Sequence, residues 1–276
     1  MNICFTINQD FIPQLEVTLS SILSNADKED RFDFYVITDY ISEQAKTSLS
    51  KKYINLHFIT AELNKDLELP LISNLSSIVY LRLQIPTLLQ NLDKVLFLDC
   101  DLIVNSSLKS LYDTDLSDSL VGAIEDYGIP KFAPKHIEKL KLQTYFNAGV
   151  LLMNLRKFRE ELTEEKCYEV LKNRKQEILF QDQDILNIVC QEKTLFLDKQ
   201  YNYQSSPSYK NTNQNGLITH YVGKYKPWNK LNYSTSYTNY WIHVFKTRHV
   251  AHFFKTFWSA NTKLLQKFFK YALRRV

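Results

Sequence analysis

Glycine is scarce in this sequence, with five residues in a chain of 276. Neither a P-loop nor a G-x-G-x-x-G pattern is present, although both are common phosphate-binding sequences. Gly-rich cradling of phosphates is therefore excluded, and any nucleotide must be held by other side chains. The chain is long enough for one large core or for a main domain with an appendage.

Cysteine pairs with metal or redox spacing are also lacking. The four cysteines show no C-x-x-C and no zinc-finger spacing, and Cys4 and Cys100 lie inside apolar runs. Free cysteines of this kind are typical of a reducing compartment, so we expect a cytoplasmic protein. The N-terminal residues do not resemble a signal peptide, and no apolar run reaches the roughly 18 residues that span a bilayer.

Acidic residues are missing from the last forty positions, 237–276, whereas basic residues recur there. From Phe253 onwards, apolar residues follow at helical spacing, with lysines and an arginine largely on the opposite face. We predict a basic aromatic helical tail over 236–276 that associates with an anionic membrane surface. The alternative is a helix that packs on the preceding domain, and the apolar face argues against a nucleic-acid partner. The residues concerned are Phe253, Phe254, Phe257, Trp258, Leu264, Leu265, Phe268, Phe269 and Ala272, opposite Lys263, Lys267, Lys270 and Arg274.

The most informative segment that is present runs from Lys94 to Val104. Its first five residues predict a strand buried on both faces, and Asp99 and Asp101 follow directly. Residues two apart point to the same side of an extended chain, so both carboxylates can bind one divalent cation such as Mg²⁺ or Mn²⁺. An isolated Asp-x-Asp is more often a simple turn, but apolar runs on both sides make two unpaired carboxylates costly here.

Strands and helices alternate along the first two thirds of the chain. Strands are predicted near 3–7, 32–37, 54–60, 94–98, 121–124 and 146–155, with helices between them, including one over 76–89. This order predicts an α/β fold with a mainly parallel sheet flanked by helices. Ligands of such sheets bind at the carboxyl ends of strands, where Asn8, Asp10 and Asp126 fall.

Three later motifs add polar groups, and each has a simpler structural explanation. Ala148-Gly149 allows close approach of a ligand or marks a bulge. Gln181-Asp-Gln-Asp184 opens a helix as a binding motif or as ordinary caps. His220 is either a third metal ligand or a core histidine, and Lys226 is suited to neutralise a phosphate.

Together, four motifs resemble glycosyltransferase family 8, in particular its bacterial lipooligosaccharide galactosyl- and glucosyltransferases. They are Asp99-x-Asp101, Asn147-Ala-Gly-Val, Gln181-Asp-Gln-Asp and His220-Tyr-x-Gly-x-x-Lys226-Pro-Trp228, and the resemblance covers roughly residues 1–230. It implies a GT-A (Rossmann-like) catalytic domain, here residues 1–235. It further implies a UDP-galactose or UDP-glucose donor, a saccharide or glycolipid acceptor such as the lipopolysaccharide core, Mn²⁺, and retention at the sugar carbon. Such an enzyme would act at the inner face of the bacterial cytoplasmic membrane.

The resemblance also implies roles for individual residues. Asp99, Asp101 and His220 match the family's metal ligands, and Lys226 with Gly223 matches its diphosphate contact. The remaining matches lie along the nucleotide-sugar: Thr6, Asn8 and Asp10 at uracil and ribose, Arg82 and Asp126 at the donor sugar, and Cys100, Asn147, Ala148, Asp182 and Gln183 between the metal and the reacting face. Close family members carry an acid at position 8 and an amide at position 10, the reverse of this chain.

The predicted chemistry centres on Gln183, because an amide is a poor nucleophile. We expect Gln183 to position and stabilise a loose, oxocarbenium-like transition state, with Asp182 and Asp184 as the nearby carboxylates that could form a covalent adduct instead. Other functions compatible with the residues are a metal-dependent nucleotidyltransferase or phosphatase, and a non-catalytic carbohydrate-binding protein.

Overall fold

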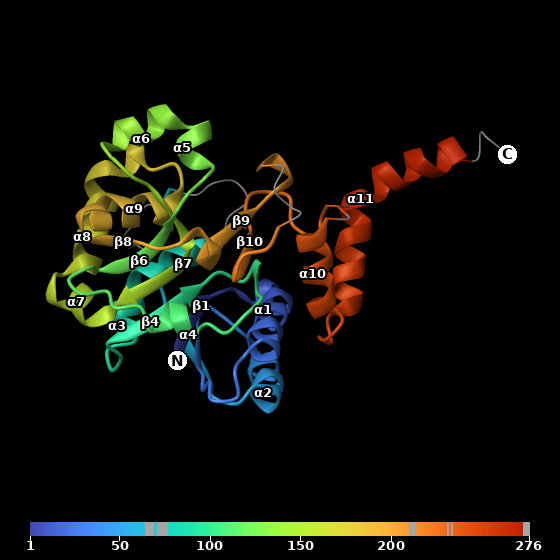
Figure 1. The fold of residues 1–276 in the computed structure, drawn as a ribbon, viewed down its shortest axis with the longest axis horizontal. Coiled ribbons are helices and arrows are strands. Elements are labelled where there is room, and N and C mark those ends of the chain that lie inside the picture. The colour runs from blue at the N-terminus through green and yellow to red at the C-terminus, as the bar shows by residue number, and fades with distance from the viewer. Residues whose placement is uncertain (64–68, 71–76, 210–213, 231, 233, 273–276) are drawn as a thin grey trace.

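The computed structural model describes residues 1–63, 69–70, 77–209, 214–230, 232 and 234–272, with only the backbone considered at 263–272. An α/β body contains most of the chain, and two helices, α10 and α11, lie at one side of it (Figure 1).

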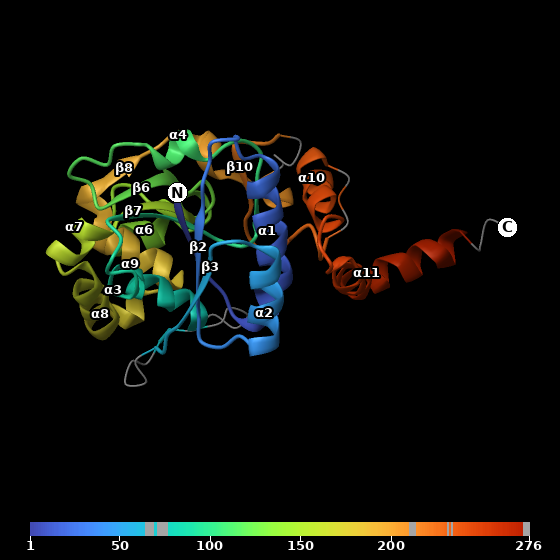
Figure 2. The ribbon, with the colours of Figure 1, turned by 90° about the horizontal axis from the view of Figure 1, so that it is seen from below.

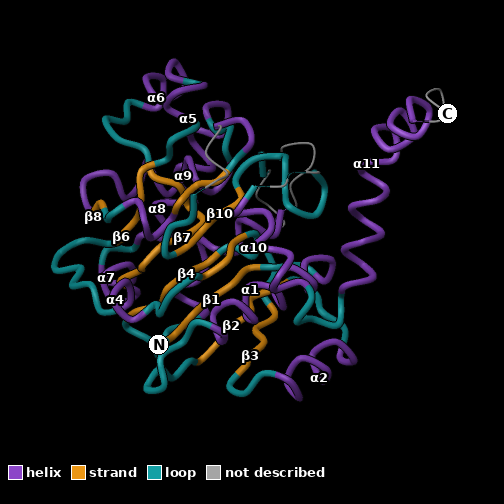
Figure 3. Tube along the Cα trace, turned by 45° about the vertical axis from the view of Figure 1, so that its right-hand side comes forward, coloured by secondary structure: helices purple, strands orange, loops and turns teal. Residues whose placement is uncertain are grey.

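A mainly parallel sheet forms the centre of the body. Within the described part of the chain it has seven strands in the order β3-β2-β1-β4-β7-β6-β8, which lie side by side in Figure 3. β7 is antiparallel to both of its neighbours, whereas the other pairs are parallel. The strands are β1 (Asn2–Thr6), β2 (Asp33–Thr38), β3 (Leu56–Thr60), β4 (Lys94–Leu98), β6 (Val121–Glu125), β7 (Phe146–Asn154) and β8 (Thr194–Phe196).

A second, smaller sheet lies next to the end of β4. It consists of β5 (Leu102–Val104), β10 (Ile218–Tyr221) and β9 (Tyr203–Ser205), in that order, as far as the described residues go. β10 is antiparallel to β5, and His220 pairs with Leu102. This pairing brings a residue from late in the chain next to the Asp99–Asp101 segment.

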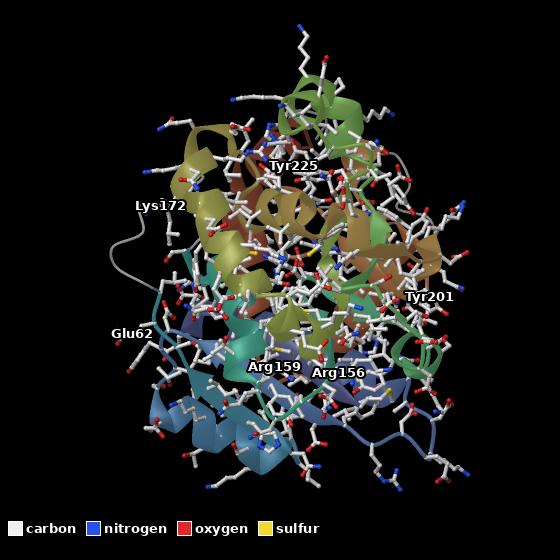
Figure 4. The ribbon with its side chains drawn as sticks, turned by 90° about the vertical axis from the view of Figure 1, so that its left-hand side faces the viewer. Glu62, Arg156, Arg159, Lys172, Tyr201 and Tyr225 are labelled. Atoms are coloured by element: carbon white, nitrogen blue, oxygen red, sulfur yellow. The ribbon has the colours of Figure 1, made fainter. Side chains whose placement is uncertain are left out.

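Helices cover both faces of the main sheet because successive strand residues point to opposite sides. Ile3 and Phe5 pack with one group of helices, α1 (Ile12–Ser24), α2 (Glu43–Lys52) and α4 (Lys109–Tyr112). Cys4 and Phe97 pack with the other, α3 (Ile85–Leu88), α7 (Leu155–Glu160), α8 (Thr163–Arg174) and α9 (Gln181–Cys190). Arg156 of α7 and Lys172 of α8 lie on the outer surface of this second layer (Figure 4).

Short elements complete the body. α5 (Ile129–Phe132) and α6 (Pro134–Leu140) follow β6, and the 3₁₀ helices are η1 (Gln9–Phe11), η2 (Ser77–Gln84), η3 (Lys175–Glu177), η4 (Gln191–Lys193), η5 (Lys199–Asn202) and η6 (Pro207–Tyr209). The helix predicted over 76–89 is wrong in type, because η2 and one turn of α3 occupy 77–88 and residue 76 lies outside the described part. Pro86 at the start of α3 has no N–H to continue a preceding α-helix.

The two C-terminal helices are α10 (Thr235–Val244) and α11 (Val250–Ala272). Tyr237, Tyr240 and Phe253 are buried in one cluster with Val17 of α1 and Ile103 of β5. α10 therefore packs on the α/β body, and the later turns of α11 extend away from it in both Figure 1 and Figure 2. The side chains of Leu264, Leu265, Phe268 and Phe269 and of Lys263, Lys267 and Lys270, as well as all of 273–276, lie outside the described residues.

Candidate active site

Asp99, Asp101 and His220 come together where β4 ends. The Nε2 atom of His220 lies 3.1 Å from Oδ1 of Asp101 and 3.8 Å from Oδ2 of Asp99. One potential ligand atom from each residue lies within 4.8 Å of the others. The three residues predicted as metal ligands thus form one cluster.

The orientation of His220 suits a metal ligand. Its Nδ1 lies 3.0 Å from Oδ1 of Asn202, while Nδ2 of Asn202 donates to Oδ1 of Asn147 at 2.9 Å. Because Asn202 thereby presents its oxygen to the ring, Nδ1 carries a hydrogen, and Nε2 is the ring atom that faces the two carboxylates and could bind a cation. Two carboxylates and one imidazole nitrogen fit Mn²⁺ well and Mg²⁺ acceptably.

Gly149 of β7 is the residue that leaves room for this cluster. A Cβ atom at this position would stand 2.2 Å from Cε1 of His220 and 2.7 Å from Oδ2 of Asp99. Any side chain would displace both potential ligands. Both explanations considered for Ala148-Gly149 therefore apply: the glycine permits the close approach of His220 and Asp99, and the register of β7 against β6 shifts across these residues.

Lys226 binds Asp101 on the side away from His220. Its Nζ forms an ion pair with Oδ2 of Asp101 and donates to the carbonyl oxygen of Tyr221 at 2.5 Å. Burial opposes ionisation of Asp101, but Lys226 and then His220 outweigh it and lower its pKa. Gly223 turns the chain between β10 and Lys226 with φ at 76°, where a side chain would be strained.

Arg82 connects the cluster of Asp99, Asp101 and His220 to the start of α9. Its Nη2 donates to Oδ1 of Asp99 at 2.6 Å, and its Nη1 lies 2.7 Å from Oδ2 of Asp182. Burial raises the pKa of Asp99, partly offset by Arg82, and burial raises the pKa of Asp182 to about 6. The guanidinium is thus the main counter-charge for the buried Asp182 and the partly buried Asp99.

A hydrogen-bond network links Asp126, Asn147 and Gln183. Oδ2 of Asp126 accepts from Nδ2 of Asn147 at 3.0 Å and from Nε2 of Gln183 at 3.2 Å. Oε1 of Gln183 accepts from the N–H of Ala148 at 2.9 Å, and Oδ1 of Asn147 accepts from the N–H of Gly149 at 3.0 Å. The network holds the amide of Gln183 in one orientation beside β7.

Asp184 is placed differently from Asp182 and Gln183. Its carboxylate is fully buried and lies 2.9 Å from Nε2 of His136 and 2.6 Å from the hydroxyl of Tyr145, which donates to it. It also accepts from the N–H groups of residues 179 and 180. Asp184 therefore belongs to a separate, well-satisfied polar cluster behind α9.

The predicted base- and ribose-binding residues lie at the end of β1. Oδ1 of Asn8 accepts from the N–H of Asp10 at 3.1 Å, which caps η1, and Thr6 is partly exposed. Phe11, which the sequence did not single out, has a ring that is 41% exposed beside them. The side chain of Cys100, between the two carboxylates in the sequence, is buried in the core cluster that contains Ile3 and Phe5.

Asn202, like Phe11, lies at the candidate site and was not predicted from the sequence. It orients His220 and contacts Asn147, yet its neighbours in the sequence form no recognisable motif. Only the folding of η5 against β7 and β10 reveals it.

A mainly parallel sheet with two carboxylates and a histidine next to it has the architecture of a GT-A enzyme with a candidate cation site. The comparisons identify which one: Glycosyl transferase family 8 matches residues 2–232, and the chain belongs to this family. The predicted family and fold are thereby confirmed, as is the assignment as a glycosyltransferase. The nucleotidyltransferase, phosphatase and non-catalytic alternatives are no longer needed.

Relatives and solved structures agree with this assignment. The lipopolysaccharide 1,3-galactosyltransferase of Salmonella typhimurium is 30% identical, over 82% of this chain and 72% of that protein. The lipopolysaccharide 1,2-glucosyltransferase of Escherichia coli K12 is 27% identical, over 83% of this chain and 73% of that protein. The galactosyltransferase LgtC, crystallised with donor and acceptor sugar analogues, superposes with a TM-score of 0.81 at 27% identity, covering 90% of this chain and 96% of that one.

Proposed function

We propose that this protein is a retaining hexosyltransferase that moves galactose or glucose from a UDP-sugar to a saccharide acceptor. The observation that supports this most is the junction at Arg82, which contacts both Asp99 of the carboxylate–histidine cluster and Asp182 beside Gln183. A lipopolysaccharide or lipooligosaccharide core is the proposed acceptor, because the Salmonella and Escherichia relatives are named for that substrate.

Mn²⁺ is the proposed cofactor, with Mg²⁺ as a weaker substitute, and Asp99, Asp101 and His220 are its proposed ligands. When bound, the ion would act as a Lewis acid that neutralises charge on the departing UDP. Lys226 adds a second positive charge for the diphosphate.

The other polar residues are proposed to hold the donor. Thr6, Asn8 and Asp10 bind uracil and ribose, and the exposed ring of Phe11 offers the base a surface for stacking. Gly223 gives the diphosphate close access to the backbone. The hexose is contacted by Arg82 of η2, Asn147 and Ala148 of β7, Asp182 and Gln183 of α9, Asp126 after β6 and Cys100 after β4. Cys100 takes part through its backbone, because its side chain is buried.

In the proposed reaction, the bond between the sugar carbon and the phosphate oxygen of UDP breaks in a loose transition state. The acceptor hydroxyl attacks from the same face, and its proton passes to the departing phosphate oxygen. Gln183, fixed by Asp126 and Ala148, positions the sugar and stabilises its developing positive charge. Asp182 faces Arg82 at the proposed donor site. Asp184 bonds to His136 and Tyr145 instead, which favours a structural role.

The test is UDP release from a panel of UDP-sugars with Mn²⁺, followed by mass spectrometry of the donor consumed. UDP-galactose or UDP-glucose should be consumed, and chelation should stop the reaction. Asp101→Asn should abolish turnover without unfolding the protein, because it removes a charge at a crevice and no core volume. Asp118→Asn is a matched control, since its fully exposed carboxylate pairs with Lys157 far from the cluster. Near-normal turnover of Asp101→Asn would contradict the proposed metal site.

We further propose that residues 1–235 are the catalytic domain and that 236–276 attach it to the inner, cytoplasmic face of an anionic membrane. No helix in the described part of the chain is long and apolar enough to cross a bilayer. The support is a cluster of exposed aromatic residues on α10 and α11, with Phe245, Phe254 and Trp258 at 61%, 50% and 58% exposure, beside Lys246 and Lys255. Partitioning of aromatic rings and attraction of lysines to anionic lipid would act together.

Deletion of the residues after Lys255 should move the protein from the membrane to the supernatant. Because Asn261 is buried and bonded to residue 229, the milder pair Phe254→Ser and Trp258→Ser should give the same shift with less disturbance. Leu162→Ser, at a 58% exposed leucine on the α/β body, is the control. Binding to anionic vesicles can be measured by flotation. If the double variant floats with the vesicles as well as the wild-type protein does, the helix packs on the α/β body and does not bind the membrane.

A further inference from the structure

Two aromatic rings lie stacked at the surface close to the Asp126 network. Phe132 ends α5 and Tyr209 ends η6, and their ring centroids are 5.9 Å apart with an interplanar angle of 18°. Phe132 is 62% exposed, so its ring contributes little to the core. Tyr209 is only partly buried, so the pair leaves aromatic surface facing the solvent.

Asp126 connects this pair to the active site. Its Oδ2 accepts from Asn147 and Gln183, while its Oδ1 accepts from the N–H groups of Gly128 and Ile129, both at 2.8 Å. The N–H of Phe132 in turn donates to the carbonyl oxygen of Gly128 at 2.8 Å. A single carboxylate therefore fixes the amide at the reacting centre and the turn that carries Phe132.

Tyr209 fits against this turn because residue 128 is glycine. A Cβ atom on Gly128 would stand 1.9 Å from the hydroxyl oxygen of Tyr209 and 2.9 Å from its ring. Burial and the charge of Asp126 raise the pKa of Tyr209 to about 12, which agrees with its place beside the carboxylate. Position 128 thus determines where Tyr209, and with it the stacked pair, can lie.

We propose that Phe132, stacked on Tyr209, is a platform for a pyranose ring of the acceptor saccharide. The face of an aromatic ring is electron-rich, and it attracts the partly positive C–H groups that line one face of a pyranose. The exposed Lys131, whose Nζ is 5.8 Å from the Phe132 ring centroid, offers donors to the sugar hydroxyls. Because one oxygen of Asp126 bonds to Asn147 and Gln183 of the proposed donor site and the other bonds to the turn that precedes Phe132, the ring lies close to the proposed donor site. The proposal depends on the hexosyltransferase function proposed above.

The experiment compares wild-type protein with Phe132→Ala and Phe132→Trp. The assay is UDP release with Mn²⁺ and the active donor, in the presence of lactose, maltose, cellobiose or a delipidated core oligosaccharide. Phe132→Ala should raise the KM of the acceptor about three- to tenfold, with the KM of the donor and acceptor-independent UDP release unchanged. Phe132→Trp should restore acceptor KM because it keeps an aromatic face.

Phe196→Ala is the matched control, since this residue is 40% exposed and lies on β8, an edge strand of the main sheet. An unchanged acceptor KM in Phe132→Ala, or an equal rise in Phe196→Ala, would overturn the platform alone. If none of the four saccharides accelerates UDP release by the wild-type protein, the platform is also overturned. Failure of the wild-type protein to release UDP from any UDP-sugar would instead overturn the proposed function, and the platform with it.

Discussion

The guanidinium of Arg82 and the carboxylate of Asp182 form a buried ion pair, with 2.7 Å between Nη1 and Oδ2. The same guanidinium donates to Asp99 and to the carbonyl oxygen of Ala148, and it lies 4.0 Å from the centroid of the Phe97 ring. Four different elements, η2, β4, β7 and α9, meet at this one side chain. Its planar fork is what allows three directed contacts at once.

Arg82→Lys should lower kcat by about 100-fold, because an ammonium cannot serve the two carboxylates and the carbonyl in the same geometry. The KM of the donor should change less, since uracil and diphosphate contacts remain. Steady-state kinetics with UDP-galactose and UDP-glucose would measure both constants. Arg156→Lys at the exposed surface of α7 is the control, and near-wild-type kcat in Arg82→Lys would show that charge alone suffices.

Gly149→Ala should weaken Mn²⁺ binding by about 10- to 100-fold, because its methyl group would push His220 and Asp99 apart. Calorimetric titration of the purified protein with Mn²⁺ would measure the change without any need for activity. Gly122→Ala in β6 is the matched control. Its Cβ would also be crowded, at 2.9 Å from Leu116, but far from the cluster. Equal metal affinity in Gly149→Ala and wild type would place the ion elsewhere.

The parts that the sequence predicted well are those with a strong local pattern. The run Lys94–Leu98 reads as a buried strand because its residues are apolar on both faces, and the structure confirms it as β4. The three metal-ligand candidates converge because Asp99 and Asp101 connect β4 to β5, and because β10, which carries His220, pairs with β5.

What the sequence could not predict depends on tertiary contacts. Asn202 carries no motif, and only its position between His220 and Asn147 gives it a role. The apolar residues of the tail were assigned to one face, but Phe253 is buried against α10 whereas Phe254 and Trp258 are exposed. Helical spacing cannot distinguish a face that meets protein from one that meets lipid, since both are apolar.

Asp184→Asn should destabilise the fold by about 2–4 kcal/mol, because an amide cannot accept all the hydrogen bonds from His136, Tyr145 and two backbone N–H groups. Denaturant unfolding would measure the loss. Asp182→Asn should lower activity more than stability, so a comparison of the two variants separates a role at the donor site from a structural role. Mass spectrometry of the unmodified enzyme during turnover should find no glycosyl adduct on Asp184, and a trapped adduct would contradict this assignment.

Glu16 of α1 binds the C-terminal helices to the α/β body. Although it is fully buried, its carboxylate lies 2.9 Å from Nε of Arg248, 3.0 Å from Nε2 of His249 and 2.7 Å from Nζ of Lys52. Burial alone would raise its pKa, but the hydrogen bonds from His249 and Lys52 lower it from 4.5 to about 2. A lowered carboxyl pKa means that the ionised group stabilises the folded state above about pH 4.5, and that this stabilisation is lost as the pH falls toward 2.

Glu16→Gln should therefore cost about 2 kcal/mol at pH 7 and flatten the fall in thermal stability between pH 5 and pH 3. Melting curves across this range would show both effects. Glu43→Gln, at an 85% exposed side chain paired with Lys46, should change neither. Hydrogen exchange at α10 should also become faster in Glu16→Gln, because Arg248 and His249 lie in the connection between α10 and α11. Unaltered exchange there would mean that the aromatic cluster around Tyr240 and Phe253 is sufficient to hold the C-terminal helices in place.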